Sequence, residues 1–377
     1  MNDSASNAES RETRPLTGQR SATERSDSFL ISRDDPILVT GAAGFIGSWV
    51  VEGLLNRGFR NIVCFARPSG KLARIEDLSN RRPQGAQIKV IKGNLLSRQD
   101  CEAACKDVAL IIHLAAGTGE KSFPDAYMNS VVTTRNLLDA SLQYGRLRRI
   151  VLISSFSVYT NCQKPHGRLL DESCPVEPRG ELRGEAYCFA KFKQEQLVAE
   201  YNKNFGIPYV VVRPGSVYGV GREAIAGRVG IDTFGLFLHI GGPNTIPFTY
   251  VENCADAIIL AGLIKGIDGE VFNVVDDDLP SSRQFLRWYK KNVRGFTSIY
   301  VPHAVSYALC YFWEKYSQWS EGQLPPAFNR RRWHAYWKKT CYSNKKLKTR
   351  LDWTPKVPTA EGLRRYFQSC RQGGRHA

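Results

Sequence analysis

Three side chains in the middle of the chain have the types and spacing for acid–base chemistry at an oxygen atom. Tyr187 and Lys191 lie four residues apart, so on a helix they share one face. The ammonium group of Lys191 would lower the pKa of the Tyr187 phenol from about 10 toward neutrality, and such a phenol can take or give a proton at a substrate oxygen. Ser155, at the end of an apolar run, would hydrogen-bond the same oxygen and orient it.

The position of Tyr187 in the chain distinguishes it from other tyrosines with the same spacing. It follows Ser155 by 32 residues, which is the length of one helical crossover. Two further pairs lie in the basic, aromatic C-terminal part, and we interpret them as packing and surface residues: Tyr311/Lys315 and Tyr342/Lys346. Ser154 and Ser157 are the hydroxyl groups that compete with Ser155 for its role.

A glycine-rich loop at the start of the apolar pattern has the form of a phosphate-binding turn. Gly41 permits a tight turn, Gly44 lets the backbone approach a pyrophosphate, and Gly47 allows the following helix to pack against the strand. The free N–H groups at the start of that helix would bind the phosphates. The spacing G-x-x-G-x-x-G at the first strand-to-helix junction therefore predicts a dinucleotide site with these members: Gly41, Ala43, Gly44, Phe45, Ile46 and Gly47.

The choice between NAD and NADP depends on the end of the second apolar run. An acidic residue there would bind the ribose 2′-hydroxyl group of NAD. The position instead holds Ala66, and Arg67 follows it. An arginine can pair with a 2′-phosphate as a planar fork. The sequence therefore favours NADP over NAD, and stacking of Arg67 on the adenine is the alternative.

Short apolar runs alternate with longer amphipathic stretches between Pro36 and Arg213. The helical stretches include residues 126–142 and 185–201, and the apolar runs are residues 37–39, 62–65, 88–91, 108–114, 150–154 and 209–212. This alternation predicts an α/β fold, with a Rossmann doubly wound parallel sheet covered by helices on both faces. The crossovers should be right-handed.

Three segments are predicted along the chain. Residues 1–35 are polar and almost without apolar side chains, so we expect a disordered tail. Residues 36–215 would form the NAD(P)-binding Rossmann domain. Residues 216–377 have a less regular pattern and would form a smaller C-terminal α/β substrate-binding portion, basic and rich in aromatic residues.

Taken together, these motifs resemble the extended short-chain dehydrogenase/reductase superfamily, the NAD-dependent epimerase/dehydratase family. The resemblance covers roughly residues 36–370. It is carried by seven motifs in order: Thr40–Gly47, Gly93-Asn94-Leu95, His113-Leu114-Ala115-Ala116, Ser154-Ser155, Tyr187-x-x-x-Lys191, Arg213-Pro214-Gly215-Ser216-Val217-Tyr218-Gly219 and Tyr250-Val251-Glu252-Asn253.

The resemblance implies cofactor contacts beyond the glycine loop. Lys191 would hold the nicotinamide ribose, and Tyr187 would serve the hydride transfer. Asn94 and Leu95 would contact the adenine. Leu114, Ala115 and Ala116 would contact the nicotinamide ribose. Pro214 and Val217 would lie beside the nicotinamide ring.

Two positions depart from the family pattern, and family members are often homodimers. Asn94 stands where the family usually has an aspartate, and an asparagine can still hydrogen-bond adenine. Ser130 stands where the family usually has an asparagine, with Asn129 one place earlier, which leaves the support of the active-site helix undefined. The resemblance also implies a homodimer through a four-helix contact of residues 126–142 and 185–201.

Three functions remain open at this point. The favoured one is oxidation and reduction, or epimerisation, of a nucleotide sugar, with the basic C-terminal part holding a diphosphate. The second is a reductase or dehydrogenase of an apolar alcohol, of the 3β-hydroxysteroid or dihydroflavonol-reductase type. The third is a non-catalytic NAD(P)-binding sensor. Dehydration is not expected, because the dehydratases carry Asp-Glu where this chain has Phe156 and Ser157.

The excess of positive charge is confined to the C-terminal part. The net charge is +16, and from Arg283 to the end there are 20 Lys or Arg against 4 Asp or Glu. Such a surface attracts phosphates, nucleic acid or anionic lipid, and a solvated face without a ligand is the alternative. No nucleic-acid motif accompanies the charge, so we expect a small-molecule substrate and no nucleic-acid partner.

The remaining features concern membrane contact, the state of the cysteines, and metal binding. The sequence has no run of 18 apolar residues, so we expect no transmembrane segment. The ten cysteines are expected to be reduced thiols of a cytoplasmic protein. The apolar stretch His303–Trp313 is too short to span a bilayer; a wall of the substrate pocket is favoured over contact with a membrane interface. No metal site is predicted: His113 is interpreted as structural, and Asp276–Asp278 as a solvated loop.

Overall fold

The computed structural model describes residues 29–373, except for residues 118, 120–121, 163–168, 223–224, 226, 234, 322 and 325–327. Its centre is a sheet of seven parallel strands in the order β12-β7-β5-β4-β1-β2-β3. The strands are β1 Ile37–Thr40, β2 Asn61–Ala66, β3 Gln87–Lys92, β4 Leu110–His113, β5 Arg149–Ile153, β7 Tyr209–Pro214 and β12 Val271–Val274. The predicted Rossmann sheet is confirmed.

The apolar runs form these strands because both faces of the sheet are covered. Every residue of β1, β4 and β5 is buried, which explains why their sequences are continuous apolar runs rather than alternating ones. β3 lies at the edge of the sheet, where most of its side chains are exposed or half-buried. The chain returns to the middle of the sheet at β4, so the carboxyl ends of β1 and β4 lie side by side.

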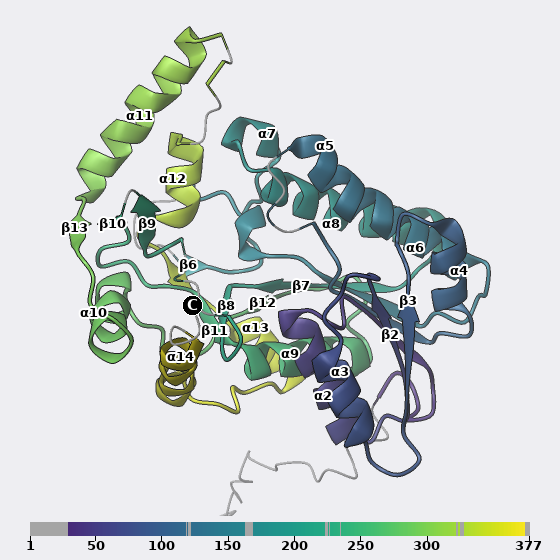
Figure 1. Ribbon diagram of the computed structural model, residues 1–377. Helices are drawn as coiled ribbons and strands as arrows, with labels where there is room; N and C mark the ends of the chain where they lie inside the picture. The colour runs from purple at the N-terminus through teal and green to yellow at the C-terminus, as the bar shows by residue number, and fades with distance from the viewer. Residues whose placement is uncertain are drawn as a thin grey trace, which may run out of the picture.

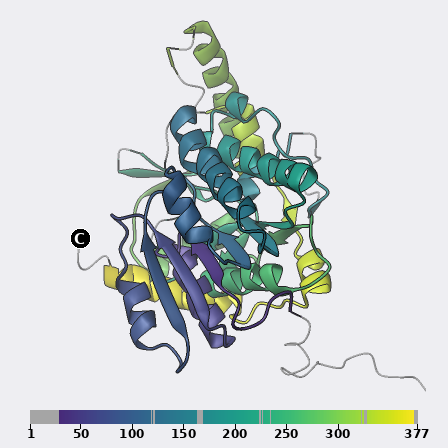
Figure 2. The ribbon, with the colours of Figure 1, turned by 90° about the vertical axis from the view of Figure 1, so that its right-hand side faces the viewer.

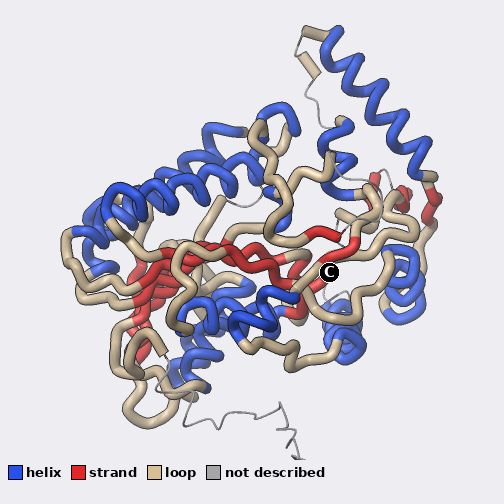
Figure 3. The backbone as a smooth tube through the Cα atoms, turned by 180° about the vertical axis from the view of Figure 1, so that it is seen from behind, coloured by secondary structure: helices blue, strands red, loops and turns tan. Residues whose placement is uncertain are grey.

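Helices cover the two faces of the sheet in separate layers (Figures 1 and 3). One layer packs on a core shared with the sheet and comprises α2 Phe45–Asn56, α3 Ala73–Asn80, α9 Val251–Leu263 and α13 Lys345–Leu351. The other layer comprises α4 Arg98–Cys105, α5 Phe123–Ala126, the π-helix Tyr127–Val132, α6 Thr133–Leu142 and α8 Ala186–Phe205.

Most of the other elements after β7, together with β6 and α7, gather at the carboxyl ends of the strands. Three small sheets form there, from β8 Ser216–Tyr218 with β11 Phe248–Tyr250, from β9 Gly230–Thr233, β10 Leu236–His239 and β13 Ser298–Tyr300, and from β6 Leu169–Leu170 with β14 Cys341–Tyr342. The helices of this part are α10 Ser282–Asn292, α11 His303–Trp319, α12 Arg330–Tyr336 and α14 Thr359–Gly373, with α7 Gly180–Arg183 beside α12. Figures 1 and 2 show α11 projecting from the body of the molecule.

Two structural findings differ from the predicted segment boundaries. β12 is an edge strand of the central sheet although it follows residue 215, where the Rossmann domain was predicted to end. Most of the predicted tail, residues 1–28, lies outside the described residues. Residues 29–35 do not follow the expectation of disorder: Phe29 forms a bridge with Ile264, and Ile31 is buried. The few apolar side chains of this segment are enough to attach it to the end of α9.

Candidate active site

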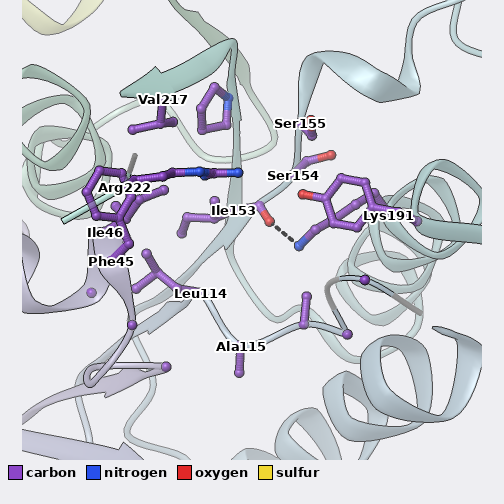
Figure 4. A pocket seen from close by; sticks show the side chains of 18 of the residues that line it. Phe45, Ile46, Leu114, Ala115, Ile153, Ser154, Ser155, Lys191, Val217 and Arg222 are labelled. Atoms are coloured by element: carbon purple, nitrogen blue, oxygen red, sulfur yellow. Dashed lines mark hydrogen bonds between the residues drawn. The ribbon is translucent and has the colours of Figure 1, made fainter. Parts of the chain in front are cut away.

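One cavity of about 1120 Å³ lies at the carboxyl ends of the central strands and contains every predicted site residue. Figure 4 shows Phe45, Ile46 and Arg222 on one side of it, with Ser155 and Lys191 on the other. The predicted residues that line it are Gly41, Ala43, Gly44, Phe45, Ile46, Gly47, Arg67, Asn94, Leu95, Leu114, Ala115, Ala116, Ser155, Tyr187, Lys191, Pro214 and Val217.

The glycine loop has the close contacts that its sequence predicts. Gly41 adopts a φ of +70°, and a Cβ there would lie 3.0 Å from the backbone nitrogen of Ala115. A Cβ at Gly47 would overlap the carbonyl oxygen of Gly41, so the helix could not begin this close to the strand. Gly44 is the N-cap of α2, and no side chain caps the first amides of the helix. These amides face the cavity and fit a pyrophosphate group.

The second strand ends at a polar loop that lines the same cavity. Arg67 is exposed, and Ser69 and Lys71 line the cavity beside it. Asn94 follows β3 and holds its own loop, since its side-chain oxygen accepts a hydrogen bond of 3.0 Å from the backbone of Leu96. The fold thus brings two cations and a hydroxyl group to the end of the cavity where the adenosine ribose of a dinucleotide would lie.

Ser155 and Tyr187 meet at the opposite end of the cavity. Ser155 caps a short 3₁₀-helix, Phe156–Val158, because its Oγ accepts a hydrogen bond of 3.1 Å from the backbone N–H of Ser157. Its hydroxyl group also interacts with the Tyr187 phenol. The Ser155 side chain therefore caps its own turn and also contacts the Tyr187 phenol. Ser154 also lines the cavity but is 98% buried.

Lys191 lies on the same face of α8 as Tyr187 and is almost fully buried. Only 3% of it is exposed, and its Nζ donates a hydrogen bond of 2.6 Å to the carbonyl oxygen of Ile153 (Figure 4). Nζ lies 5.9 Å from the centre of the Tyr187 ring. Burial lowers the pKa of Lys191 to about 7, and the carboxylate of Glu195 opposes this shift.

The predicted direction of the Tyr187 pKa shift is wrong for the protein itself. Burial raises the pKa of the phenol, while the hydrogen bond with Ser155 and the charge of Arg222 lower it less. Desolvation disfavours the phenolate more than these neighbours favour it. In the protein alone, Tyr187 is therefore a neutral phenol at physiological pH and can donate a proton.

A π-helix explains the departure from the family pattern at Ser130. The wider turn of residues Tyr127–Val132 places Asn129 in the lining of the cavity, while Ser130 is buried behind it. Ser130 Oγ accepts a hydrogen bond of 3.0 Å from the backbone of Gly117, and its carbonyl oxygen accepts from Thr134 and Gln194. π-helical turns often occur at functional sites. Asn129 was not among the predicted site residues.

The cavity also contains side chains that the sequence did not identify. Arg222 and Arg228 line it from the segment after β8, and Tyr336 lines it from α12. The Arg228 guanidinium lies 5.0 Å from the centre of the Tyr336 ring, and its NH1 group donates to the carbonyl oxygen of Ala335. No local pattern marks these residues, because an arginine in a loop and a tyrosine in a short helix have many surface counterparts.

The stretch His303–Trp313 does not form the predicted wall of the substrate pocket. Among the described residues that line the cavity, none belongs to α11. α12 lies between α11 and the cavity, and Tyr336 provides the aromatic wall instead. The apolar composition of α11 therefore needs another explanation.

Two polar residues considered as metal ligands have protein partners. His113 bridges two hydroxyl groups, with Nδ1 2.7 Å from Thr40 Oγ1 and Nε2 2.9 Å from Thr134 Oγ1, and burial lowers its pKa to about 3. Asp276 does not lie in a solvated loop, as we expected. It is 98% buried, accepts a hydrogen bond of 2.8 Å from the backbone of Tyr250, and has its pKa raised by burial to about 7.

Comparison with known proteins places the chain in a family. A model of the NAD dependent epimerase/dehydratase family matches residues 37–274, more than half of the chain. The chain belongs to this family. The matched region contains the glycine loop, Ser155, and the Tyr187/Lys191 pair, so the predicted family is confirmed. The family is one of NAD-dependent enzymes, and its fold agrees with the seven-stranded sheet.

Relatives of this epimerase/dehydratase family member differ in the substrates that their names give. The trifunctional UDP-glucose 4,6-dehydratase/UDP-4-keto-6-deoxy-D-glucose 3,5-epimerase/UDP-4-keto-L-rhamnose-reductase of Arabidopsis thaliana is 29% identical over 63% of this chain, and the chain spans only 36% of its length. The 3beta-hydroxysteroid-dehydrogenase/decarboxylase isoform 1 of Arabidopsis thaliana is 24% identical over 88% of this chain and 79% of its own length.

A solved structure matches nearly the whole fold. UDP-glucuronic acid 4-epimerase from Bacillus cereus, in complex with UDP-glucuronic acid and NAD, is 25% identical to this chain. The match has a TM-score of 0.67 and covers 89% of this chain and 99% of the epimerase. The similarity therefore includes the C-terminal elements around the cavity as well as the central sheet.

Proposed function

We propose that this family member is an NAD(P)-dependent epimerase or oxidoreductase of a nucleotide sugar, which moves a hydride at a secondary alcohol or ketone. The observation that carries the proposal is that the N-terminus of α2 lines the same cavity as Ser155, Tyr187 and Lys191. UDP-sugar relatives and the fold of a UDP-glucuronic acid epimerase support it. Residues 36–215 would hold the cofactor, and residues 216–377 would hold the substrate.

The residues have separate roles in this mechanism. The nicotinamide, when bound, supplies or accepts the hydride. Tyr187 gives or takes the proton at the substrate oxygen, and Ser155 orients that oxygen by a hydrogen bond. Lys191 would hold the nicotinamide ribose and, in its protonated form, would provide positive charge beside the phenol. A Tyr187→Phe variant should lose about 10²- to 10⁴-fold in turnover and keep its cofactor affinity. Retained biological activity would instead support the non-catalytic sensor.

The cofactor would be held by the residues on the sheet side of the cavity. Asn94 and Leu95 would contact the adenine, and Leu114, Ala115 and Ala116 the nicotinamide ribose, with Pro214 and Val217 beside the ring. We propose that NADP is preferred over NAD, because Arg67 and Lys71 line the cavity after β2 and a guanidinium group can pair with a 2′-phosphate. The preference is measured by comparing the dissociation constants of the two dinucleotides.

The guanidinium groups on the substrate side favour a diphosphate-containing substrate. Two arginine side chains line the cavity, Arg222 beside Phe45 and Arg228 beside Tyr336, and planar guanidinium groups bind phosphate oxygens in pairs. UDP should therefore raise the melting temperature beyond the shift produced by NADP. The Arg228→Gln variant should lose the UDP shift and keep the NADP shift, and the matched Arg67→Gln variant should do the reverse.

Aromatic residues in the same cavity support the alternative of an apolar alcohol. Phe248, Phe285, Tyr336 and Tyr366 line its substrate side, and a relative is named as a 3beta-hydroxysteroid dehydrogenase. The absence of any UDP shift in the wild-type protein, together with a shift produced by a sterol, would favour this second function. We do not expect dehydratase activity, because Phe156 and Ser157 follow Ser155 where the dehydratases of the family carry Asp-Glu.

We also propose a homodimer through the outer faces of α6, α8 and the π-helix. Met128, Leu142 and Phe205 are exposed apolar side chains on these elements. Light scattering coupled to size-exclusion chromatography measures the mass directly, and a monomer at micromolar concentration would contradict this part of the proposal.

A further inference from the structure

The outward face of α11 is apolar, although the helix lies on the surface of the molecule. Five side chains recur at the helical intervals of three and four residues and form one stripe, which we call the α11 stripe: Val305, Leu309, Phe312, Tyr316 and Trp319. Their exposed fractions range from 48% for Val305 to 76% for Trp319. A surface helix normally exposes its polar face, whereas α11 exposes an apolar one.

The inward face of α11 combines small, polar and aromatic side chains, including Tyr307, whose ring centre lies 5.1 Å from that of Trp333. Ser306, Cys310 and Ser317 are its buried residues. Ser306 Oγ accepts a hydrogen bond of 2.9 Å from the indole nitrogen of Trp333 in α12. This contact fixes the orientation of the helix and keeps the α11 stripe outside the core. An exposed apolar patch of this kind marks a site of contact with another surface.

The surface next to the α11 stripe is strongly basic. Between Arg283 and Trp313 the chain has five Lys or Arg and no Asp or Glu. Four of these cations are exposed on α10 and just after it: Arg283, Arg287, Lys291 and Arg294. The next carboxylate, Glu314, forms an ion pair with Arg330. The edge that carries α10, β13 and α11 therefore presents a row of exposed cations beside apolar side chains.

The exposed apolar side chains continue along this edge. Trp288 on α10 and Ile299 and Tyr300 on β13 are exposed by 38%, 52% and 42%. Figures 1 and 3, from opposite sides, both show α10, β13 and α11 following one another along the same edge of the molecule. Apolar, aromatic and basic side chains thus occupy one continuous border of the fold, away from the central sheet.

We propose that this edge binds the surface of an anionic lipid bilayer, with α11 lying along the membrane interface. Aromatic side chains such as Tyr316 and Trp319 prefer the boundary between headgroups and acyl chains. The cations of α10 would pair with lipid phosphates, whereas two copies of this edge would repel each other through their like charges. Among the described residues no helix has the length and apolar composition to cross a bilayer, so the contact is interfacial.

The proposal is tested by co-sedimentation of the full chain with vesicles. One set of vesicles is pure phosphatidylcholine, and the other contains about a third of phosphatidylglycerol, which gives a negative surface potential. The wild-type protein should bind the anionic vesicles and should bind the neutral vesicles at least 10-fold more weakly. High salt should weaken the anionic binding, because it screens the charges of α10.

Two double variants separate the apolar and the electrostatic contributions. Phe312→Ser with Trp319→Ser removes the most exposed part of the α11 stripe and should lower the partition coefficient at least 10-fold. Arg287→Gln with Lys291→Gln should lower it roughly 30-fold, at about 1 kcal/mol for each charge. Both variants should keep the enzymatic activity in solution, since neither pair lines the cavity.

Matched controls remove similar side chains elsewhere. Val90, on β3, is 37% exposed, and Val90→Ser should leave vesicle binding unchanged. Lys89→Gln with Lys92→Gln removes two exposed charges from β3 and should leave it nearly unchanged. The proposal is overturned if the wild-type protein does not bind anionic vesicles, or if the control pairs reduce binding as much as the edge variants. It is also overturned if the α11 variant converts a dimer to a monomer without vesicle binding, because the stripe would then be an interface between copies.

Discussion

Replacing Lys191 by methionine should stabilise the protein at low pH while it abolishes activity. The lysine is 3% exposed, and burial lowers its pKa from 10.5 to about 7. The difference of about 3.5 pH units, at about 1.36 kcal/mol for each, corresponds to a burial cost on the order of 5 kcal/mol for the charged form. Methionine has a similar length and no charge. The lost hydrogen bond to the carbonyl oxygen of Ile153 offsets about 1 kcal/mol of the gain.

The size of this stabilisation depends on pH. Below pH 7 the lysine is charged in both the folded and the unfolded protein, so the folded wild type bears the whole burial cost. Between pH 7 and 10.5 the folded protein has lost the proton and the unfolded chain still binds it. The contribution of Lys191 to the free energy of unfolding therefore rises by about 1.4 kcal/mol per pH unit across this range. The advantage of the Lys191→Met variant should shrink accordingly and vanish above pH 10.5.

The assay is urea unfolding of the wild type and the Lys191→Met variant, compared at pH 6 and at pH 9.5. The variant should have the larger free energy of unfolding at pH 6, by several kcal/mol, and the two curves should nearly coincide at pH 9.5. Comparing the two proteins cancels the other titrating groups. A variant less stable than the wild type at pH 6, or a difference that does not change with pH, would refute the argument that burial of the ammonium group dominates its energetics.

Three further substitutions test other parts of the structure. Arg67→Ala should weaken NADP binding about 10- to 100-fold, from the loss of hydrogen bonds to a charged group, and leave NAD binding unchanged in a fluorescence titration; equal losses for both would exclude a 2′-phosphate contact. Gly47→Ala should destabilise by about 1–3 kcal/mol in thermal unfolding, because its Cβ would overlap the carbonyl oxygen of Gly41; an unchanged melting temperature would contradict this close approach. Arg213→Met should cost about 3–5 kcal/mol, because it leaves Glu195 buried and unpaired; the double variant with Glu195→Leu should recover most of the loss in urea unfolding.

Local patterns were sufficient for the central sheet and for the cofactor side of the cavity. The apolar runs became parallel strands, and the glycine loop joins β1 to α2 as its spacing predicts. Tyr187 and Lys191 share a face of α8 because a four-residue spacing on a helix requires it. These features depend on residues that are close in sequence, and the family motifs repeat them in a known order.

The other wall of the cavity could not be predicted in the same way. Arg222, Arg228 and Tyr336 come from segments more than 100 residues apart, and only the packing of α12 brings them together. Asn129 lines the cavity because a single wide turn rotates it into place, and no periodicity in the sequence indicates that turn. The same limit explains why α11 was expected in the pocket wall: its composition is apolar, but its neighbours decide which face is covered.

The sequence by itself determined the family and the parallel sheet, and it predicted that the glycine loop, Ser155, Tyr187 and Lys191 would line one cavity, since each depends on residue type and short spacing. Only the tertiary structure decided the protonation tendencies of Tyr187 and Lys191, because burial depends on every segment that surrounds them. It also decided that the apolar face of α11 is turned outward, because the hydrogen bond between Ser306 and Trp333 and the contact with α12 hold the opposite face against the fold.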